Sequence, residues 1–252
     1  MKLGLIGKPL SHSFSPSYFA EKFQTEKLNQ YSYKAFELES IKELPKLLQH
    51  PDIKGLNVTA PFKKEVIPYT HELRGAARQL GAVNTLALEN NQWVGYNTDV
   101  IGFEKSLLPL LNKDQEMKAL VLGTGGSSQA VQWVLKKLHL PFQLVSRSVK
   151  KEQLSYADLS PDLLEKHKLI INTTPLGTWP KIEESPVQSL EGVSDAHLCY
   201  DLIYNPEKTR FLELAEERGA QIKNGLEMLQ IQAEESFAIW NSSKDQSFSN
   251  SQ

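Results

Sequence analysis

The chain has 252 residues, a net charge of −2, 40% apolar residues and 23% charged residues. This charge argues against a large nucleic-acid-binding surface, and no apolar run approaches the roughly 20 residues that a membrane-spanning helix needs. The N-terminus lacks a signal peptide's apolar segment, and the single cysteine, Cys199, lies in an apolar run typical of a buried side chain in a reducing compartment. We therefore expect a cytoplasmic enzyme or binding protein.

The first hundred residues alternate between strand-like and helix-like patterns. Apolar runs predict strands at residues 3–6, 31–37, 55–59, 84–89 and 92–97. Asn90 and Asn91 separate the last two runs and suit the positive-φ positions of a tight hairpin turn. Helical patterns lie at residues 16–28, 40–49, 61–68 and 71–80. Ser15 is expected to cap the first helix, with Pro16 as its first residue. The alternation predicts an α/β fold with a mostly parallel sheet.

A second alternation follows a short polar linker at residues 112–118. Before the linker, a helix is predicted at residues 98–111. After it, strands are predicted at residues 119–123, 142–146, 169–172, 197–203 and 221–223, and helices at 127–138, 207–219 and 226–240. The Ser-rich tail, residues 242–252, is expected to be disordered. This pattern indicates a second α/β domain.

The segment GTGGSS at residues 123–128 has the context of a phosphate-binding turn, because it lies between a buried strand and a helix. Gly123 suits the tight turn. Gly125 or Gly126 lets the backbone approach a pyrophosphate beside the free N–H groups of the helix N-terminus. Ser128 stands where a third glycine is usual, so a plain strand–helix turn is the alternative. We expect a dinucleotide site here.

The end of the following strand indicates which dinucleotide binds. An NAD site usually has an acidic residue about 20 residues beyond the first glycine, where it binds the ribose 2′-hydroxyl. Here the chain has Ser146, Arg147 and Ser148, with no carboxylate before Glu152. An arginine at this position makes paired hydrogen bonds to a phosphate, which favours NADP(H). The alternative is a basic surface loop without a ligand.

The segment GLNVTAPFKKE at residues 55–65 predicts a strand up to Thr59, and Pro61 suits the first turn of a helix. Lys63 would then meet the positive end of the helix dipole, which lowers the pKa of its ammonium. Asp99 follows a later strand and is a candidate partner, because parallel strands place their carboxyl ends at one edge of a sheet. A Lys–Asp pair can give and take a proton at an alcohol or ketone oxygen. The alternative is a solvated lysine and an aspartate that caps a helix.

Other polar side chains collect near the predicted strand ends: Ser13, Ser15, Asn57, Thr59 and Asn84. Each alone is interpreted as a helix cap, a turn residue or a hydrogen bond at a strand end. Together they could line a pocket of hydroxyl and amide groups, which suits a small polyhydroxylated substrate. A lone histidine beside a turn is usually structural, and we expect this of His12 rather than a role in proton transfer.

Eight segments resemble the shikimate dehydrogenase family, from about Leu3 to Trp240. They are GKPLSHSFSPSYF, GLNVTAPFKK, GAVNTL, GYNTD, GTGGSSQAV, INTTPLGTWP, YDLIYNPEKTRFL and NGLEMLQIQA. Their order and spacing together are very specific. The resemblance implies reversible reduction of 3-dehydroshikimate to shikimate with NADPH, a step in the biosynthesis of chorismate and the aromatic amino acids.

The resemblance also implies a domain organisation. We expect an α/β fold with an N-terminal substrate domain on a mostly parallel sheet, a Rossmann-like NADP-binding domain and a cleft between them. The substrate domain is expected over residues 1–100, completed by a C-terminal helix at 225–241. The NADP domain is expected over residues 101–224.

Matching positions in the family give each candidate residue a role. Lys63 and Asp99 match the catalytic pair. The residues that match substrate-binding positions are Ser13, Ser15, Asn57, Thr59, Asn84, Tyr204 and Gln232. The residues that match cofactor-binding positions are Gly123, Gly125, Gly126, Ser146, Arg147, Ser148, Gly225 and Met228. No metal is expected.

The chain departs from the family pattern at two places. Ser146-Arg147-Ser148 replaces the usual Asn-Arg-Thr, which leaves the strictness for NADP over NAD open. The chain after Trp240 is short and polar, where the family often adds a helix pair.

Two alternative functions stay open. A quinate or quinate/shikimate dehydrogenase is disfavoured by the missing acidic residue, and a non-catalytic NADP-binding sensor is disfavoured by the intact Lys63–Asp99 pair. As partners we expect a small-molecule substrate and no nucleic acid or membrane, in a monomer or homodimer.

Overall fold

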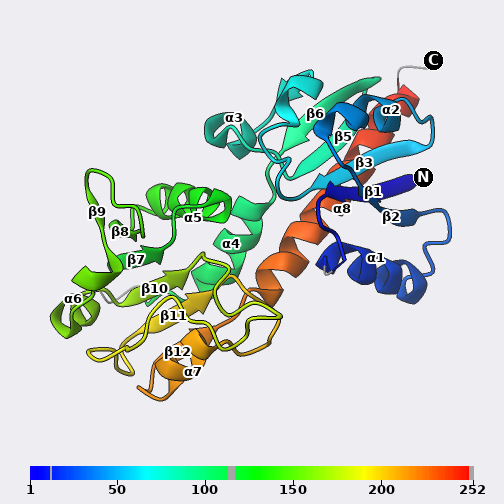
Figure 1. Cartoon of the computed structure of the whole chain (residues 1–252). Helices are drawn as coiled ribbons and strands as arrows, with labels where there is room; N and C mark the ends of the chain where they lie inside the picture. The colour runs from blue at the N-terminus through cyan, green and yellow to red at the C-terminus, as the bar shows by residue number, and fades with distance from the viewer. Residues whose placement is uncertain (12, 113–116, 250–252) are drawn as a thin grey trace. The chain divides into compact units, whose positions relative to one another are not determined.

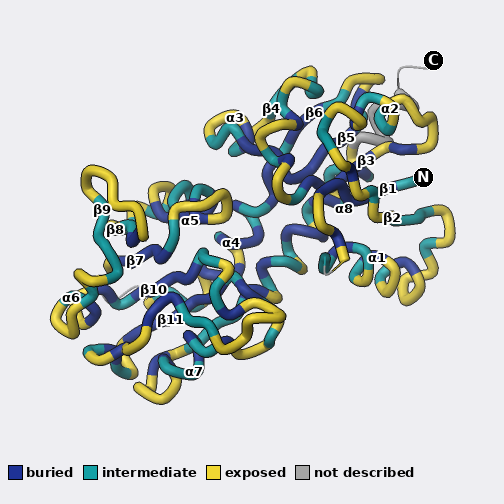
Figure 2. Tube along the Cα trace, in the orientation of Figure 1, coloured by how far each residue is buried: buried dark blue, intermediate teal, exposed yellow. Residues whose placement is uncertain are grey.

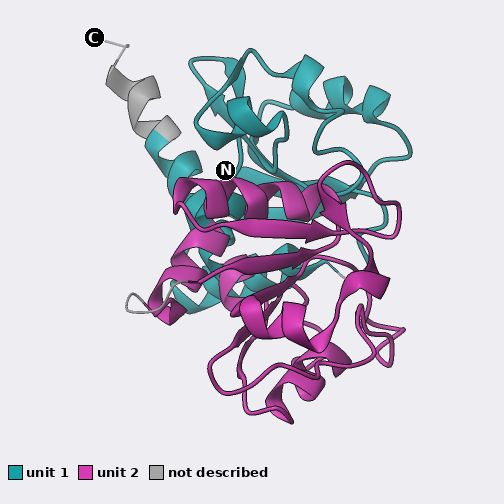
Figure 3. Cartoon of the chain, turned by 90° about the vertical axis from the view of Figure 1, so that its left-hand side faces the viewer, with its two compact units in different colours: residues 1–101, 230–252 teal, residues 102–229 magenta. Residues whose placement is uncertain are grey.

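The chain forms two compact units, each built on its own β-sheet (Figure 1). Unit 1 comprises Met1–Ile101 and Gln230–Gln252, and unit 2 comprises Gly102–Leu229 (Figure 3). The assignment of substrate and cofactor to the two units stays a prediction.

The structure is a computed structural model, and it describes residues 1–11, 13–112 and 117–249, with the backbone alone for 243–249. His12, the middle of the predicted linker and the end of the predicted tail lie outside these residues. None of the helices in the described part of the chain is long and apolar enough to cross a membrane.

Unit 1 contains a six-stranded mixed sheet. Its strands are β1 (Lys2–Gly7), β2 (Ser32–Glu37), β3 (Ile53–Val58), β4 (Glu72–Leu73), β5 (Thr85–Glu89) and β6 (Gln92–Tyr96). They lie in the order β2-β1-β3-β5-β6-β4, and only β5 runs against its neighbours, so the sheet is mostly parallel as predicted. Asn90 and Asn91 join β5 to β6 with φ values of 47° and 64°, which confirms the predicted hairpin turn.

Helices of unit 1 cover both faces of this sheet. They are α1 (Phe14–Thr25), α2 (Leu44–Leu48), α3 (Ala76–Leu80), the start of α4 (Asp99–Leu107) and most of α8 (Leu226–Ser249). Helix α1 begins earlier than predicted: Ser13, not Ser15, is its N-cap, and Pro16 is its third residue. Proline is tolerated there because N–H groups in a first helical turn have no acceptor within the helix.

Two apolar layers hold unit 1 together, and the central strands β1, β3 and β5 between them are largely buried (Figure 2). On one face, α2, α3 and the segment after β3 pack around Leu56 and Leu86. On the other face, α1 and α8 bury the aromatic side chains of Phe19, Phe23 and Trp240. Burial of apolar surface on both faces is the main stabilising contribution to this unit.

Trp240 sets the position of α8 on the sheet. It is 1% exposed, and its indole Nε1 donates to the Leu86 carbonyl at 2.9 Å. The ring lies against Gly55 on β3, where an added Cβ would come within 2.3 Å of ring atoms. Residues four apart share one face of a helix, so Trp240, Ser236 and Gln232 all face the sheet. The packing of Trp240 therefore also orients Gln232.

Unit 2 contains a second six-stranded sheet, in which every pairing is parallel. Its strands are β7 (Ala119–Leu122), β8 (Phe142–Val145), β9 (Gln153–Leu154), β10 (Leu169–Asn172), β11 (Leu198–Asp201) and β12 (Gln221–Lys223). The order β9-β8-β7-β10-β11-β12 is the 3-2-1-4-5-6 order of a Rossmann fold.

The remaining helices of unit 2 are α5 (Gly126–Lys137), α6 (Pro161–Lys166) and α7 (Arg210–Glu216). Cys199 on β11 is fully buried in the apolar core of this unit, as predicted, and burial raises the pKa of its thiol to about 12. A thiol with such a pKa stays protonated at neutral pH and is not a nucleophile.

Some local predictions were wrong. The predicted helix at residues 61–68 is a run of turns that ends in a short 3-10 helix, Ile67–Tyr69. The sequence patterns did not predict β4, β9 or α6, because such short elements show no clear hydrophobic period. Helix α8 continues to Ser249, and the disorder expected for residues 242–252 stays a prediction. No proline or glycine after Leu226 stops that helix.

Candidate active site

One edge of the unit 1 sheet collects the predicted catalytic residues. β3 and β6 run in the same direction because each is antiparallel to β5, which lies between them. Their carboxyl ends and the start of β5 therefore share one edge of the sheet. Lys63 follows β3, Asp99 follows β6, and Asn84 directly precedes β5. β3 and β6 are parallel as expected but are not neighbours, and the reversed β5 between them adds Asn84 to the pair.

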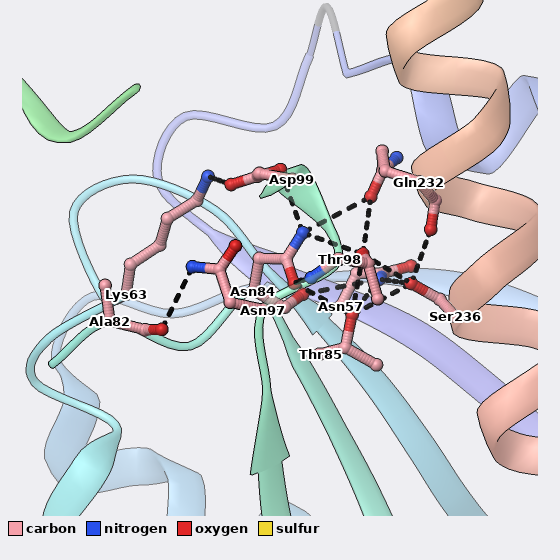
Figure 4. Close-up of polar contacts among 10 residues, drawn as sticks. All are labelled: Asn57, Lys63, Ala82, Asn84, Thr85, Asn97, Thr98, Asp99, Gln232 and Ser236. Atoms are coloured by element: carbon pink, nitrogen blue, oxygen red, sulfur yellow. Dashed lines mark hydrogen bonds and ion pairs between the residues drawn. The ribbon is translucent and has the colours of Figure 1, made fainter. Parts of the chain in front are cut away.

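Lys63 and Asp99 form the predicted pair. The Lys63 ammonium lies 2.7 Å from Asp99 Oδ2, with side-chain exposures of 28% and 15% (Figure 4). The other carboxylate oxygen, Oδ1, accepts a hydrogen bond from Asn84 Nδ2 at 2.8 Å. Asp99 is thus held on both sides, which orients the ammonium at a partly exposed position that a ligand can reach.

The helix expected at Lys63 is absent, and the reason is a tertiary contact. In a helix, the Lys63 carbonyl would accept from the N–H of Ile67. Here it accepts from Val83 N–H at 2.7 Å, and Ile67 N–H donates to the Lys64 carbonyl instead. Lys63 therefore lies on a loop, and the argument from the helix dipole does not apply. The pairing with Asp99 orients its side chain.

Behind the pair lies a buried cluster of amide and hydroxyl groups (Figure 4). Asn57 Nδ2 is 3.0 Å from Ser236 Oγ and 3.2 Å from Thr85 Oγ1. Thr98 N–H donates to Asn84 Oδ1 at 2.7 Å, and this fixes which atom of the Asn84 amide faces Asp99. These contacts join β3, β5 and the segment after β6 to α8 and position Asn84.

Gln232 joins this cluster from α8. Its Oε1 lies 3.4 Å from both Asn84 Nδ2 and Thr98 Oγ1, and the Ser236 hydroxyl donates to its backbone carbonyl at 2.9 Å. Gln232 is 6% exposed. The structure thus brings together Lys63, Asp99, Asn84, Asn57 and Gln232. The hydrogen bond between Asn57 and Ser236 joins residues that are 179 positions apart in the chain.

Tyr33 links a further predicted residue to the cluster. Its hydroxyl donates to Asn57 Oδ1 at 2.8 Å. Burial raises the pKa of the Tyr33 phenol, and a hydrogen bond from the Ser15 hydroxyl opposes this rise. Sequence reasoning missed Tyr33 and Ser236. The detectable signal for Ser236 was a polar residue four positions after Gln232 on an otherwise apolar helix face.

Ser13 and Thr59 occupy ends of elements rather than the cluster. Ser13 caps α1 without a side-chain hydrogen bond to the helix, and its N–H donates to the Leu10 carbonyl at 3.1 Å. Thr59 follows β3, and its N–H donates to the Ile6 carbonyl at 2.9 Å. Both side chains are partly exposed. Their substrate contacts stay a prediction.

The candidate cofactor turn lies between β7 and α5 in unit 2. Gly123 has a φ of +101°, and an added Cβ would come within 2.9 Å of Thr173 Oγ1, so the turn requires glycine. Gly125 is the N-cap of α5 and Gly126 is its first residue, and nothing lies within 4 Å of an added Cβ at either position. The N–H groups of this first turn lack acceptors within the helix, so the open turn fits a pyrophosphate.

Ser146, Arg147 and Ser148 follow β8, the strand beside β7. Ser146 is 7% exposed, and its hydroxyl oxygen accepts from Ser148 N–H at 3.3 Å. Arg147 is exposed between them, so its guanidinium can bind a phosphate. The glycine turn is adjacent, because Gly123 N–H donates to the Val145 carbonyl at 2.9 Å. This donor set fits NADP(H) better than NAD.

Three further predicted residues also belong to unit 2. Tyr204 is partly buried, and burial raises the pKa of its phenol. Gly225 directly precedes α8, and an added Cβ there would come within 2.0 Å of the Leu202 carbonyl oxygen, so the position requires glycine. Met228, in the first turn of α8, is 5% exposed. Their roles toward substrate and nicotinamide stay predictions.

Asp201, at the end of β11, is a buried carboxylate that the sequence analysis did not identify. It accepts hydrogen bonds from Thr209 Oγ1 at 2.7 Å, Ile203 N–H at 2.9 Å and Asn172 Nδ2 at 3.1 Å. Burial raises the pKa of Asp201 to about 6, although these hydrogen bonds oppose the rise. The contacts join the segments that follow β10 and β11.

Comparison with known proteins places this chain in one family. A sequence model described as the shikimate dehydrogenase substrate binding domain matches residues 5–86. The curated shikimate dehydrogenase (NADP(+)) of Methanococcus aeolicus is 37% identical over 254 aligned positions, which cover 94% of this chain and 91% of that protein. A crystal structure of a shikimate dehydrogenase in complex with NADP+ has 32% identity and a TM-score of 0.83, covering 96% of this chain and 90% of that chain.

A more distant enzyme shares the same fold. Quinate dehydrogenase from Corynebacterium glutamicum, in complex with NAD, is 22% identical with a TM-score of 0.85, and 99% of each chain is covered. This likeness concerns the fold alone, whereas the relatives above 30% identity share sequence along nearly the whole chain. The chain therefore belongs to the shikimate dehydrogenase family.

Proposed function

We propose that this chain is an NADP-dependent shikimate dehydrogenase, which interconverts 3-dehydroshikimate and shikimate in chorismate and aromatic amino acid biosynthesis. The observation that carries the proposal is the Lys63–Asp99 ion pair, with Asn84 on the second oxygen of Asp99. An ammonium held in this way can give a proton to an oxygen atom and take it back. Family membership supports the substrate class and the cofactor.

Lys63 is the proposed proton donor. In the reduction, the ketone carbon gains a hydride and the ketone oxygen gains a proton. NADPH, when bound, is the source of the hydride. The Lys63 ammonium stabilises negative charge that develops on the oxygen and then transfers its proton to that oxygen, leaving a neutral amine. Asp99 and Asn84 orient Lys63 before the substrate binds, so little reorganisation is needed during the reaction.

The polar side chains around the pair support a small polyhydroxylated substrate. Asn84 and Gln232 present amide groups beside Asp99. Ser15 is connected to this cluster by hydrogen bonds from Ser15 to Tyr33 and from Tyr33 to Asn57. We assign the remaining substrate contacts to Ser13, Thr59 and Tyr204 on the basis of family positions. Rigid neutral donors and acceptors of this kind bind hydroxyl groups without adding charge to the site.

NADP(H) is the proposed cofactor. The turn of Gly123, Gly125 and Gly126 fits the pyrophosphate, and Arg147 fits the 2′-phosphate. No acidic residue lies between Gly123 and Glu152, so none is placed to repel that phosphate or to bind a free 2′-hydroxyl. Gly225 and Met228 are assigned to the nicotinamide side from their family positions.

The test is NADPH oxidation, followed by absorbance, with 3-dehydroshikimate as substrate. Lys63→Ala is expected to lower kcat by about 10²- to 10⁴-fold with little change in KM, since a general acid acts mainly in the transition state. Asp99→Asn is expected to weaken both turnover and substrate binding. Lys64→Ala is the matched control, because Lys64 is the neighbouring, exposed lysine and is expected to keep wild-type kinetics. A near-normal kcat for Lys63→Ala would refute the assigned role.

The same assay separates the alternatives. Turnover of quinate with NAD, and not of 3-dehydroshikimate with NADPH, would identify a quinate dehydrogenase. Binding of NADPH without turnover of any of these substrates would identify a sensor. The exposed Arg147 and the intact Lys63–Asp99 pair favour the first proposal over both.

A further inference from the structure

Asn97 carries a buried acceptor without a donor. It follows β6, two residues before Asp99, and is 7% exposed. Its Nδ2 donates to the Ala82 carbonyl at 3.0 Å. Among the described residues, Asn97 Oδ1 is the one buried side-chain N or O atom without a hydrogen-bond partner. A backbone carbonyl only accepts, so the amide nitrogen must face Ala82 and Oδ1 must face away.

The orphan oxygen points toward Lys63. Figure 4 shows Asn97 Oδ1 directed toward the side on which Lys63 and Asp99 meet. The Lys63 ammonium has three N–H donors, and Asp99 Oδ2 takes one of them. In the proposed reaction a second donor reaches the substrate oxygen. The third donor then lacks an acceptor, and Asn97 Oδ1 lacks a donor.

Asn97 is also coupled to the backbone of the Lys63 loop. Its amide holds the carbonyl of Ala82, and the N–H of the next residue, Val83, holds the carbonyl of Lys63 at 2.7 Å. Asn97 is therefore linked both to the main chain and to the side chain of Lys63. Its Nδ2 supports the segment that holds the main chain, and its Oδ1 faces the side chain.

We propose that Asn97 is a positioning residue for Lys63, whose Oδ1 accepts a hydrogen bond from the ammonium while a second N–H of Lys63 faces the substrate. The inference rests on the proposed role of Lys63 as proton donor. The amide dipole stabilises the ammonium more than the neutral amine. Asp99, at the start of α4, is the charged group in contact with Lys63 among the described residues. The neutral groups around Asp99 are Asn84 before β5, Thr98 after β6 and Gln232 on α8.

Two variants of Asn97 separate this role from a structural one. Asn97→Ala and Asn97→Asp both lose the donor to Ala82, but alanine removes the acceptor and aspartate replaces it with a carboxylate. We expect the pKa of the Lys63 ammonium to fall by about one unit in Asn97→Ala and to rise by about one unit in Asn97→Asp. Asn97→Ala is also expected to lower kcat about 10-fold near neutral pH, with less effect on KM.

The measurement is an NMR titration of lysine-labelled protein, with the Lys63 signal assigned by its loss in Lys63→Arg. This readout needs no turnover. The alkaline limb of kcat/KM against pH should move in the same direction as the NMR titration. Asn112→Asp is the matched control, since it adds the same charge at an exposed position in unit 2 and should not move the Lys63 signal.

Equal shifts in the two variants, or no shift in either, would overturn the proposal, because both variants lose the contact with Ala82. A rise in KM without a change in the pKa of Lys63 would also overturn it, because it would place a substrate hydroxyl on Oδ1. If thermal unfolding shows that Asn97→Asp is misfolded, Asn97→Ser takes its place, because its hydroxyl keeps an acceptor without the amide. The pKa of Lys63 must then stay higher than in Asn97→Ala, and equal pKa values in these two variants would overturn the proposal. Absence of turnover in the wild-type protein would refute the proposed function. The NMR titration would still decide whether Asn97 positions Lys63.

Discussion

The contact between Trp240 and Gly55 predicts a measurable energetic coupling between α8 and β3. An added Cβ at residue 55 would lie 2.3 Å from Trp240 Cδ1 and Nε1, which are parts of a rigid, fully buried ring. Because neither the strand nor the ring can move freely, Gly55→Ala is expected to cost about 1–3 kcal/mol of unfolding free energy by overpacking. Trp240→Ala removes the ring and its hydrogen bond to Leu86, so it is expected to cost about 3–5 kcal/mol.

In the double variant the new methyl group enters the space that the indole leaves. The cost of Gly55→Ala should therefore almost vanish in the Trp240→Ala background, which corresponds to a coupling of about 1–3 kcal/mol between the sites. The assay is urea unfolding of the wild type, both single variants and the double variant, followed by far-UV circular dichroism. Trp240→Phe is a control that keeps most of the ring volume and loses the Nε1 donor. Costs that add to within about 0.5 kcal/mol would refute the proposed packing.

Two further predictions concern unit 2. Arg147→Ala is expected to raise KM for NADPH about 10- to 100-fold and to leave KM for NADH nearly unchanged, because only NADPH carries the 2′-phosphate; Arg218→Ala, at an exposed arginine, is the control, and equal effects on both cofactors would contradict the assignment. Asp201, whose folded-state pKa is raised to about 6 by burial, binds a proton more tightly in the folded than in the unfolded chain. The protonated carboxyl therefore stabilises the folded state fully below about pH 4. This stabilisation, about 3 kcal/mol of unfolding free energy, is lost as the pH rises through 6. Asp201→Asn should remove this fall in unfolding free energy between about pH 4 and 6, as measured by urea unfolding. If the fall is unchanged in the variant, groups other than Asp201 cause it.

Several parts of the fold follow from local sequence. The hairpin at Asn90 and Asn91 was predictable because these residue types tolerate positive φ. The glycine turn was predictable because Gly123 needs a φ that other residues avoid, and it follows a buried apolar strand. The strands of the parallel sheets were predictable because buried parallel strands are continuous apolar runs. In each case the physical cause acts within a few residues of the signal.

The Lys63 loop shows where local reasoning fails. Its sequence satisfies the usual rules for a helix start, yet the Lys63 carbonyl bonds to Val83, twenty residues later in the chain. A pattern within residues 55–65 contains no information about that partner. The expected pairing with Asp99 was nevertheless correct, because it depended on the direction of strands and not on the helix.

By itself, the sequence of this protein determined which segments form strands and which chemical groups stand at their ends. It therefore indicated the α/β class, the glycine turn, the basic residue after β8 and the Lys–Asp chemistry. Only the tertiary structure decided that β5 runs backwards and adds Asn84, that Trp240 orients Gln232 and Ser236, and that the unpaired oxygen of Asn97 points toward Lys63. The difference is physical: backbone preference and hydrophobic period act over neighbouring residues, whereas these contacts depend on packing between segments that are distant in the chain.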